Sequence, residues 1–278
     1  NLHNDRLLLW EVEFILTHIA PCTEVLNKID LNLLPETLQL SDLERITEPP
    51  PPCFSLDLDG VNEYIQAPIN SAFDLDKDNA MSLECWVKFD TFNTFNQFFT
   101  KYVGSRGILF MVTGNEIRFD LQSTGGLNAI IVQTTGAVMT TGVWYHLAVT
   151  YDGSENASGV KIYKNGLLIP STLIQNNISA TIVTTANVQI GRVGSFYVNG
   201  LFNQVRWWNT ELNQTEITYQ YNNRTETPAQ AANLILNTDI QNSTWNGIEF
   251  DIPDLTGITA GYATVNAEEE DKVEDCPS

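Results

Sequence analysis

Carboxylates near the start of a β-patterned region have the oxygen chemistry that a calcium ion requires. The candidate metal ligands are Asp57, Asp59, Asp74, Asp76 and Asp78. The last three have the spacing of the first EF-hand ligands, but Asn79 and Cys85 stand where that loop requires Gly and Glu. The sequence therefore excludes an EF-hand. The Ca²⁺ site that we predict is a loop site, formed by some of these aspartates together with backbone carbonyls.

A second string of carboxylates, Glu269, Asp271 and Glu274, has the E-x-D-x-x-E spacing of retaining β-glucanases. Double displacement requires two carboxylates about 5 Å apart on a rigid support. Because no apolar residues alternate with this string, we interpret it as a solvated run of charge. The sequence also lacks a Gly-rich phosphate loop, HExxH and GxSxG. We therefore predict no catalytic residue, and a glycoside hydrolase would require two other carboxylates that converge in a cleft.

His146 lies in the most regular segment of the chain, "VWYHLAVTY". A period of two places Tyr145, Leu147 and Val149 on one face of a strand, and His146 and Ala148 on the other. Both faces are largely apolar, which is typical of a strand that is covered on both sides, as in a two-sheet sandwich. The other two histidines lie far away in the sequence, so we interpret His146 as a sheet residue that holds one hydrogen bond.

Aromatic side chains interleaved with amides could stack on sugar rings and hydrogen-bond their hydroxyl groups. The segments "FDTFNTFNQFFTKY" and "RWWN" have this composition. The candidate ligand-binding residues in them are Phe92, Phe95, Asn96, Tyr102 and Trp207. Large apolar side chains are usually buried, so we expect most aromatic residues of these segments to belong to the core.

Short β-patterned runs separated by turn residues must position these side chains. The candidate strands are 53–59, 63–68, 82–89, 97–103, 107–113, 116–122, 129–135, 143–152, 159–169, 187–193 and 202–209. Gly, Asn and Asp fill the segments between them, which favours tight turns. Residues 212–223 form the one short helical pattern in this region. The pattern predicts an all-β fold with two antiparallel sheets in a jelly-roll sandwich.

Composition changes divide the chain into five parts. Residues 1–48 contain a helical pattern, and the prolines of 49–53 form a stiff polyproline linker. The jelly roll spans 54–225, followed by a β extension over 226–266. The acidic residues 267–278 bury too little apolar surface to fold alone, so we predict a disordered tail.

Net charge excludes several classes of partner. Fourteen Lys and Arg residues against 34 Asp and Glu residues give a formal charge of −20, which repels the phosphate backbone of nucleic acids. No apolar run approaches the roughly 20 residues of a membrane-spanning helix, so we predict no membrane insertion. Cys85 alternates with apolar residues and is predicted to be a buried free thiol. A bridge between Cys22 and Cys53 is one candidate pairing among the other cysteines.

Several motifs resemble the concanavalin A-like, laminin-G-type jelly-roll superfamily. They are "FSLDLDGVNEYIQAP", "MSLECWVKF", "GVWYHLAVTYDG", "VKIYKNGLLI", "VQIGRV" and "GLFNQVRWWNTELNQTEI". Their order and spacing match that superfamily over about residues 54–222. The superfamily includes lectins, adhesion modules and glycosidases, so the resemblance implies the fold and leaves function to the site. Asn203 stands where the family commonly has an Asp, a departure that weakens direct transfer of a calcium site.

The sequence predicts a non-catalytic, lectin-like module that recognises a glycan or protein surface through jelly-roll loops. The alternative is a structural part of a larger particle, because "RLLLWEVEFILTHIAPCTEVL" resembles the end of phage-tail and contractile-injection baseplate proteins. An apolar helix too short to build its own core needs a partner surface, so residues 1–48 would dock onto other subunits. Both interpretations favour an extracellular or cell-surface location for the protein, or a location in a tail-like particle.

Overall fold

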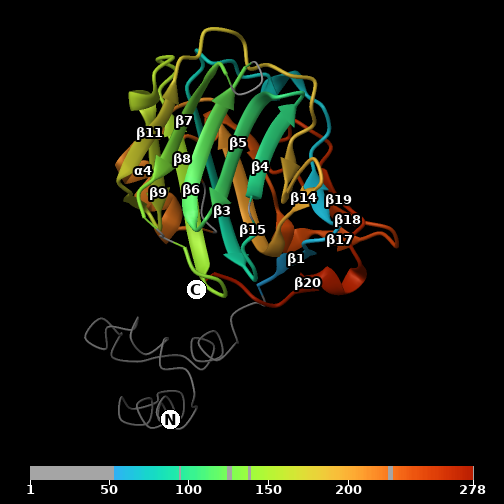
Figure 1. Cartoon of the computed structure of the whole chain (residues 1–278). Helices are drawn as coiled ribbons and strands as arrows, with labels where there is room; N and C mark the ends of the chain where they lie inside the picture. Colours follow the sequence, from blue (N-terminus) through green and yellow to red (C-terminus); the bar gives the residue numbers. More distant parts are fainter. Residues whose placement is uncertain (1–52, 94, 124–126, 137–138, 225–227, 278) are drawn as a thin grey trace, which may run out of the picture. The chain divides into compact units, whose positions relative to one another are not determined.

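Two antiparallel sheets pack face to face in the computed structural model (Figure 1). The structure describes residues 53–93, 95–123, 127–136, 139–224 and 228–277. The predicted docking segment 1–48 and nearly all of the 49–53 linker lie outside the described residues. The unit Cys53–Ser278 is compact.

The eight-stranded sheet contains, from one edge to the other, β10 (Leu167–Leu168), β9 (Val160–Lys164), β8 (Trp144–Tyr151), β3 (Met81–Phe89), β15 (Asn199–Trp208), β1 (Ser55–Asp59) and β20 (Lys272–Val273), and β16 (Leu234–Asn237) also pairs with β15. The ten-stranded sheet contains β11 (Ser171–Asn176), β7 (Ala129–Thr134), β6 (Glu116–Gln122), β5 (Arg106–Thr113), β4 (Asn96–Val103), β12 (Gln189–Ile190), β2 (Tyr64–Gln66), β19 (Tyr262–Val265), β18 (Phe250–Ile252) and β17 (Thr244–Trp245). The predicted all-β, two-sheet antiparallel jelly roll is confirmed. Short 3₁₀ turns lie at Ser71–Phe73, Ala157–Gly159, Ala231–Asn233, Ile240–Asn242 and Glu269–Asp271.

Alternating side chains of the two sheets build the main core. In β6, Ile117, Phe119 and Leu121 are fully buried between the sheets, whereas the residues between them face outwards. Across the sandwich, Trp207 stacks on Phe73 with ring centroids 5.6 Å apart. The inner faces are thus packed with aromatic and branched side chains, which fixes the register of the outward-facing residues.

A second layer covers the outer face of the eight-stranded sheet. Helix α4 (Gln214–Asn222) begins with a capping box of Asn213 and Glu216. Its Ile217 packs with Trp208, Ala148 and other side chains in a small second core. The sheet is therefore covered on both faces, which explains why the β8 segment is apolar on both sides.

The C-terminal region is more ordered than we predicted. Residues 226–266 supply strands to both sheets, including β16 and β19. The predicted disordered tail instead forms a 3₁₀ turn and β20, which pairs with β1. Cys276 forms a disulfide with Cys53, so the candidate pairing of Cys22 with Cys53 is wrong. Strand pairing and the disulfide hold a segment that its own apolar surface could not.

Two further features concern the remaining cysteine and membrane crossing. Cys85 is buried and free, as predicted, and burial raises the pKa of its thiol well above the usual value. Within the described residues, no helix is both long enough and apolar enough to cross a membrane.

Candidate binding face

Two of the predicted ligand-binding residues are buried. Trp207 has none of its surface exposed and lies in the main core, in edge contact with Phe99. Asn96 is also fully buried, and its side chain bonds the backbone of Asn93 and the carbonyl of Val112. Neither residue can reach a ligand. Alternation along β15 cannot expose a tryptophan, because both faces of its sheet are covered.

Three of the five aspartates predicted as metal ligands bond to other groups of the protein. The Asp59 carboxylate accepts hydrogen bonds from the N–H groups of Val61 and Asn62. Asp76 accepts from Lys77 and Ile182. Asp74 forms an ion pair with Lys101, Asp57 is half-buried, and Asp78 is exposed. Among the described residues, no three His, Cys, Asp or Glu side chains form a group that could hold a metal ion. The five aspartates thus do not form one such group, and a Ca²⁺ loop site that combines some of them with backbone carbonyls stays a prediction.

His146 is a buried structural residue, as its position in the strand indicated. Its Nε2 lies 3.1 Å from Oε2 of Glu84, and its ring packs against those of Trp86 and of Tyr221 of α4. Arg206 donates to the other oxygen of Glu84 at 3.0 Å. Within this network His146 stands on the face that α4 covers, so it has no path to a ligand.

The outer face of the ten-stranded sheet carries polar side chains and lies on the opposite side of the sandwich from α4. Cross-strand register places one continuous row of side chains on this face, running through Asp251, Ala263, Gln66, Gln189, Thr100, Leu109, Asp120, Ile131 and Gln175. The centre of the row, Thr100, Leu109, Asp120 and Ile131, is buried, whereas the glutamines toward its ends are half-buried. Amide groups both donate and accept, so these glutamines offer neutral hydrogen bonds on this face.

Tyr102 forms a platform at one end of this face. The cross-strand partner of Tyr102 is Gly107, whose partner on the next strand is Gln122. Gly107 carries no side chain, and the Tyr102 hydroxyl reaches across it to donate to Oε1 of Gln122 at 3.0 Å. A Cβ at this position would lie 1.9 Å from the Lys101 carbonyl oxygen, and φ is +131°, so only glycine fits. The half-buried ring of Tyr102 is thereby held across the sheet.

Gln122, Asp120 and Arg118 continue the platform along β6. Gln122 donates its Nε2 to Asp120 at 2.8 Å, and Arg118 forms two hydrogen bonds to Asp120 at 2.7 and 2.8 Å. These bonds raise the pKa of Arg118 above its usual value. Asp120 has no exposed surface. It therefore fixes the orientation of its two neighbours and cannot reach a ligand itself. We call Tyr102, Gln122, Asp120 and Arg118 the tyrosine platform.

A two-stranded hairpin, β13 (Arg192–Val193) and β14 (Phe196–Tyr197), lies beside β4 (Figure 1). The guanidinium of Arg192 lies over the rings of Tyr64 and Tyr197, 4.5 and 5.2 Å from their centroids. Phe196 contacts Phe95 edge to face, with centroids 5.6 Å apart. These five residues form what we call the hairpin cluster. Of the predicted phenylalanines, Phe95 is exposed here, whereas Phe92 packs against Phe89 of the core.

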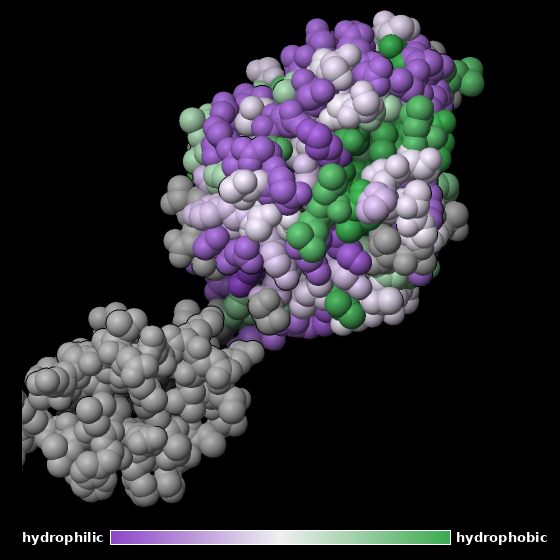
Figure 2. Space-filling view, turned by 90° about the vertical axis from the view of Figure 1, so that its left-hand side faces the viewer, coloured by the Kyte–Doolittle hydropathy of each residue, from purple (hydrophilic) through white to green (hydrophobic). Residues whose placement is uncertain are grey.

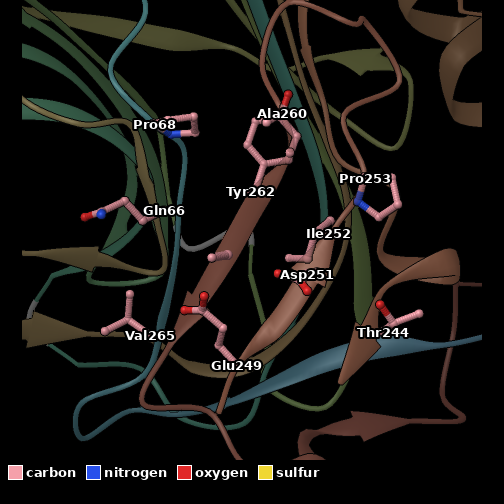
Figure 3. A pocket seen from close by; sticks show the side chains of 12 residues that line it. Gln66, Pro68, Thr244, Glu249, Asp251, Ile252, Pro253, Ala260, Tyr262 and Val265 are labelled. Carbon is pink, nitrogen blue, oxygen red and sulfur yellow. The ribbon is translucent and has the colours of Figure 1, made fainter. Parts of the chain in front are cut away.

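A depression of about 600 Å³ lies beyond the hairpin on the same face (Figure 3). Gln66 and Val265 line one side of it, and Glu249 and Asp251 of the β18 region line the other. Asp251 accepts a hydrogen bond from Asn246 at 3.2 Å. The depression is open to solvent beside β18 and the edge strand β17.

One further surface is apolar. Figure 2 shows a stripe of apolar residues on the side of the molecule that carries β11. Leu167 and Leu168 of β10 and Leu173 and Ile174 of β11 are each more than half exposed. The two edge strands thus leave apolar side chains at one edge of the sandwich.

Comparisons with known proteins agree with this architecture. The sequence model of the concanavalin A-like lectin/glucanases superfamily matches residues 59–218. No curated protein sequence matches the chain. Among solved structures, a Bacteroides ovatus protein to which carbohydrate binding is ascribed superposes with a TM-score of 0.55 and 16% identity. The match covers 78% of this chain and 59% of that chain, so the chain spans less than two thirds of that protein.

Two more solved structures have lower similarity. The CBM40 of a Ruminococcus gnavus IT-sialidase, bound to α2,3-sialyllactose, is 16% identical over 59% of this chain and 94% of its own, with a TM-score of 0.48. A heptameric SAP-like pentraxin from Limulus polyphemus is 12% identical over 63% of this chain and 84% of its own, with a TM-score of 0.45. At these identities the solved structures show only that the fold is similar.

Most residues of the tyrosine platform and of the hairpin cluster were not predicted as ligand-binding residues from the sequence. Tyr102 and Phe95 were, because they are aromatic and stand among amides. Arg118, Asp120 and Gln122 follow a period of two in "EIRFDLQ", a signal that marks one face of β6 as polar. Arg192 lies in β13, which the predicted strand 187–193 merged with β12, and Phe196 lies in β14, which was not predicted.

Proposed function

We propose that this chain, which belongs to the concanavalin A-like lectin/glucanases superfamily, is a non-catalytic module that binds a glycan on the outer face of its ten-stranded sheet. A sugar ring presents an apolar face and a rim of hydroxyl groups. A binding site for it therefore needs a flat apolar surface bordered by groups that donate and accept hydrogen bonds.

The tyrosine platform is the observation that carries the proposal. Tyr102 is held across Gly107 by its hydrogen bond to Gln122, so its ring loses little conformational freedom when a ligand stacks on it. Arg118 and Gln122 are oriented by Asp120, and their remaining N–H groups face the same side of the sheet. A pre-organised aromatic ring beside fixed donors favours a sugar over a flat apolar ligand.

Binding without hydrolysis is the second part of the proposal. A retaining glycosidase needs two carboxylates about 5 Å apart that both face the sugar. At the tyrosine platform the carboxylate of Asp120 is fully buried and bonded to Arg118 and Gln122. It can neither donate a proton to a leaving group nor attack a sugar carbon.

The disulfide supports a place outside the reducing cytosol. Disulfides form and persist mainly in oxidising compartments. The Cys53–Cys276 bridge joins the two ends of the described unit. We therefore propose that the module acts on the cell surface or outside the cell, where glycans are accessible.

Variants of Tyr102 test the proposal on a glycan array followed by titration calorimetry with the strongest ligand. We expect Tyr102→Ala to weaken binding by more than about tenfold, as for an aromatic hot spot. Tyr102→Phe keeps the ring and loses one hydrogen bond, so we expect a weakening of about two- to tenfold. Tyr219→Ala removes a tyrosine that is 38% exposed on α4 and serves as the matched control. Equal binding by Tyr102→Ala and the wild type would sink the proposed site.

A further inference from the structure

We infer that the glycan carries an acidic group, a carboxylate or a sulfate, and that Arg192 of the hairpin cluster binds it. The inference rests on the proposed function, because it concerns the ligand of the same face. It begins from the charge balance of the chain. The chain has 34 acidic residues against 14 Lys and Arg, and Lys77, Lys88, Lys101, Arg118, Lys161 and Arg206 each pair with a carboxylate. Arg118 and Arg206, for example, each bond to a buried carboxylate.

Arg192 has no such partner. Within the described ranges, no carboxylate lies within ion-pair distance of its guanidinium. Its Nε donates to the Gly194 carbonyl at 2.9 Å, and the flat faces of the group lie against two tyrosine rings. The N–H groups on Nη1 and Nη2 of Arg192 are therefore available to donate hydrogen bonds to a ligand. Because planar N–H pairs match carboxylate and sulfate oxygens, an anion is the chemistry that completes this site.

The surroundings hold the guanidinium in one orientation. Tyr64 is 8% exposed and belongs to β2, while Tyr197 belongs to the second strand of the hairpin. The hydrogen bond from Nε of Arg192 to the Gly194 carbonyl holds the side chain against its own turn. An arginine that is already ordered loses less entropy on binding an anion than a free surface arginine does.

The position of Arg192 links it to the tyrosine platform. Thr100 stands two residues before Tyr102 on the same face of β4, and its hydroxyl donates to the Arg192 carbonyl at 2.8 Å. Strand spacing and rise place Tyr64 and Tyr102 roughly 17 Å apart on this face. Gln189 lies in the row between them, beside Thr100. A short oligosaccharide could therefore stack on Tyr102 and bring an acidic substituent to Arg192.

Neighbouring carboxylates define the direction of the ligand. Glu249 and Asp251 line the depression on the far side of Tyr64 from β4. An anionic chain is repelled from that side. It is drawn instead to the β4 side, where Arg192 lies and where Arg118 and Asp120 form a pair without net charge. The acidic ligand therefore lies between the hairpin cluster and the tyrosine platform.

Matched pairs of oligosaccharides test the inference. The probes are an oligogalacturonate and its methyl ester, sialyllactose and lactose, and a sulfated galactan oligosaccharide and its desulfated form. By titration calorimetry at low salt, we expect at least one acidic member to bind about tenfold more tightly than its neutral partner, the value of one charge-assisted hydrogen bond. That preference should fall as salt is raised. The carboxylate and sulfate pairs distinguish the two kinds of anion.

Variants separate this inference from the proposed function. We expect Arg192→Gln to bring the affinities of the two members of a pair to within about twofold of each other, chiefly by weakening the acidic member, and Arg192→Lys to keep part of the preference. Lys161→Gln removes one positive charge from the other sheet and is the control. Neutral members that bind as well as acidic ones, or a preference that survives Arg192→Gln, would overturn the inference alone. If neither member of any pair binds the wild type, the proposed function fails with it.

Discussion

A buried glutamate anchors the side of the molecule opposite the proposed binding face. Glu84 is 3% exposed and contacts His146, Arg206 and Gln220. Burial works to raise the pKa of Glu84, but the hydrogen bonds and charges of His146 and Arg206 outweigh it, and the pKa lies below its usual value. Glu84 is thus ionised in the folded protein and joins β3, β8, β15 and α4.

Removing the Glu84 carboxylate should strongly destabilise the folded protein. We expect Glu84→Ala to lower the free energy of unfolding by about 3–5 kcal/mol, because Arg206 would remain buried without its counter-ion. The measurement is urea denaturation followed by tryptophan fluorescence. Glu211→Ala is the control: it breaks an ion pair with Lys161, whose side chain is 47% exposed, and should cost less than about 1 kcal/mol. Similar losses for the two variants would contradict this account of Glu84.

Sequence reasoning identified some of these residues and missed others for a physical reason. The apolar neighbours of His146 marked it as structural, and its lack of nearby ligating residues excluded a metal. Glu84 could not be paired with it, because that requires the register Glu84↔Ala148 between β3 and β8. Trp207 was wrongly taken for a ligand residue, because alternation places the two tryptophans on opposite faces of β15 without telling which face packs between the sheets.

At the scale of elements, periodicity predicted most strands of both sheets and the helix after the last of them. It missed β11, the β13–β14 hairpin and β20, which are short or follow from long-range pairing. The tail was the largest error. Its strand β20 is held by pairing with β1 and by a disulfide whose two cysteines are 223 residues apart in sequence. Neither contact can be read from the local sequence.

Carboxyl groups at the junction of the tail with the β1–β2 turn predict a pH-dependent stability. Burial, with the neighbouring Asp271 and Asp59, raises the pKa of Glu63 to about 7, although a hydrogen bond from the Asp59 N–H opposes this. The pKa of Asp271 is also raised, chiefly by burial. Between about pH 4.5 and 7 the folded chain therefore binds more protons than the unfolded chain, so stability falls as pH rises through this window.

Calorimetry can measure this dependence directly. We expect a higher Tm at pH 5.5 than at pH 7.5 for the wild type. The difference should shrink in Glu63→Gln, which keeps an acceptor for the Asp59 N–H and cannot ionise. Ser158→Ala, a change on an exposed turn remote from the tail, should leave the difference intact. A Tm that is equal or higher at pH 7.5 in the wild type would show that these carboxyls do not control stability.

At the scale of the whole molecule, the ends of the described unit meet on the edge of the eight-stranded sheet. Cys276 and Asp275 hold this junction. The Asp275 carboxylate accepts from Trp144 Nε1 at 2.8 Å and pairs with Lys88. The proposed binding face belongs to the other sheet. Closing the ends of the unit in this way leaves the outer face of the ten-stranded sheet free of the tail.

Reduction of the disulfide should reveal its contribution to stability. A bridge that spans 223 residues of sequence stabilises by about 5 kcal/mol in the chain-entropy model. We expect the Cys53→Ser/Cys276→Ser double variant to melt at a clearly lower temperature than the wild type. Added reductant should lower the Tm of the wild type and leave that of the double variant unchanged. A wild type that melts at the same temperature with and without reductant would contradict a stabilising role.

The central claim is that a glycan binds on the outer face of the ten-stranded sheet, and hydrogen–deuterium exchange with and without the strongest array ligand tests it most directly. The account predicts that bound glycan slows amide exchange in β4–β6, residues 96–122, and in the hairpin 192–197. Exchange in α4 and the eight-stranded sheet should not change. Protection confined to the 74–80 and 152–159 loops, or to α4, would contradict the claim and place the ligand elsewhere on the molecule.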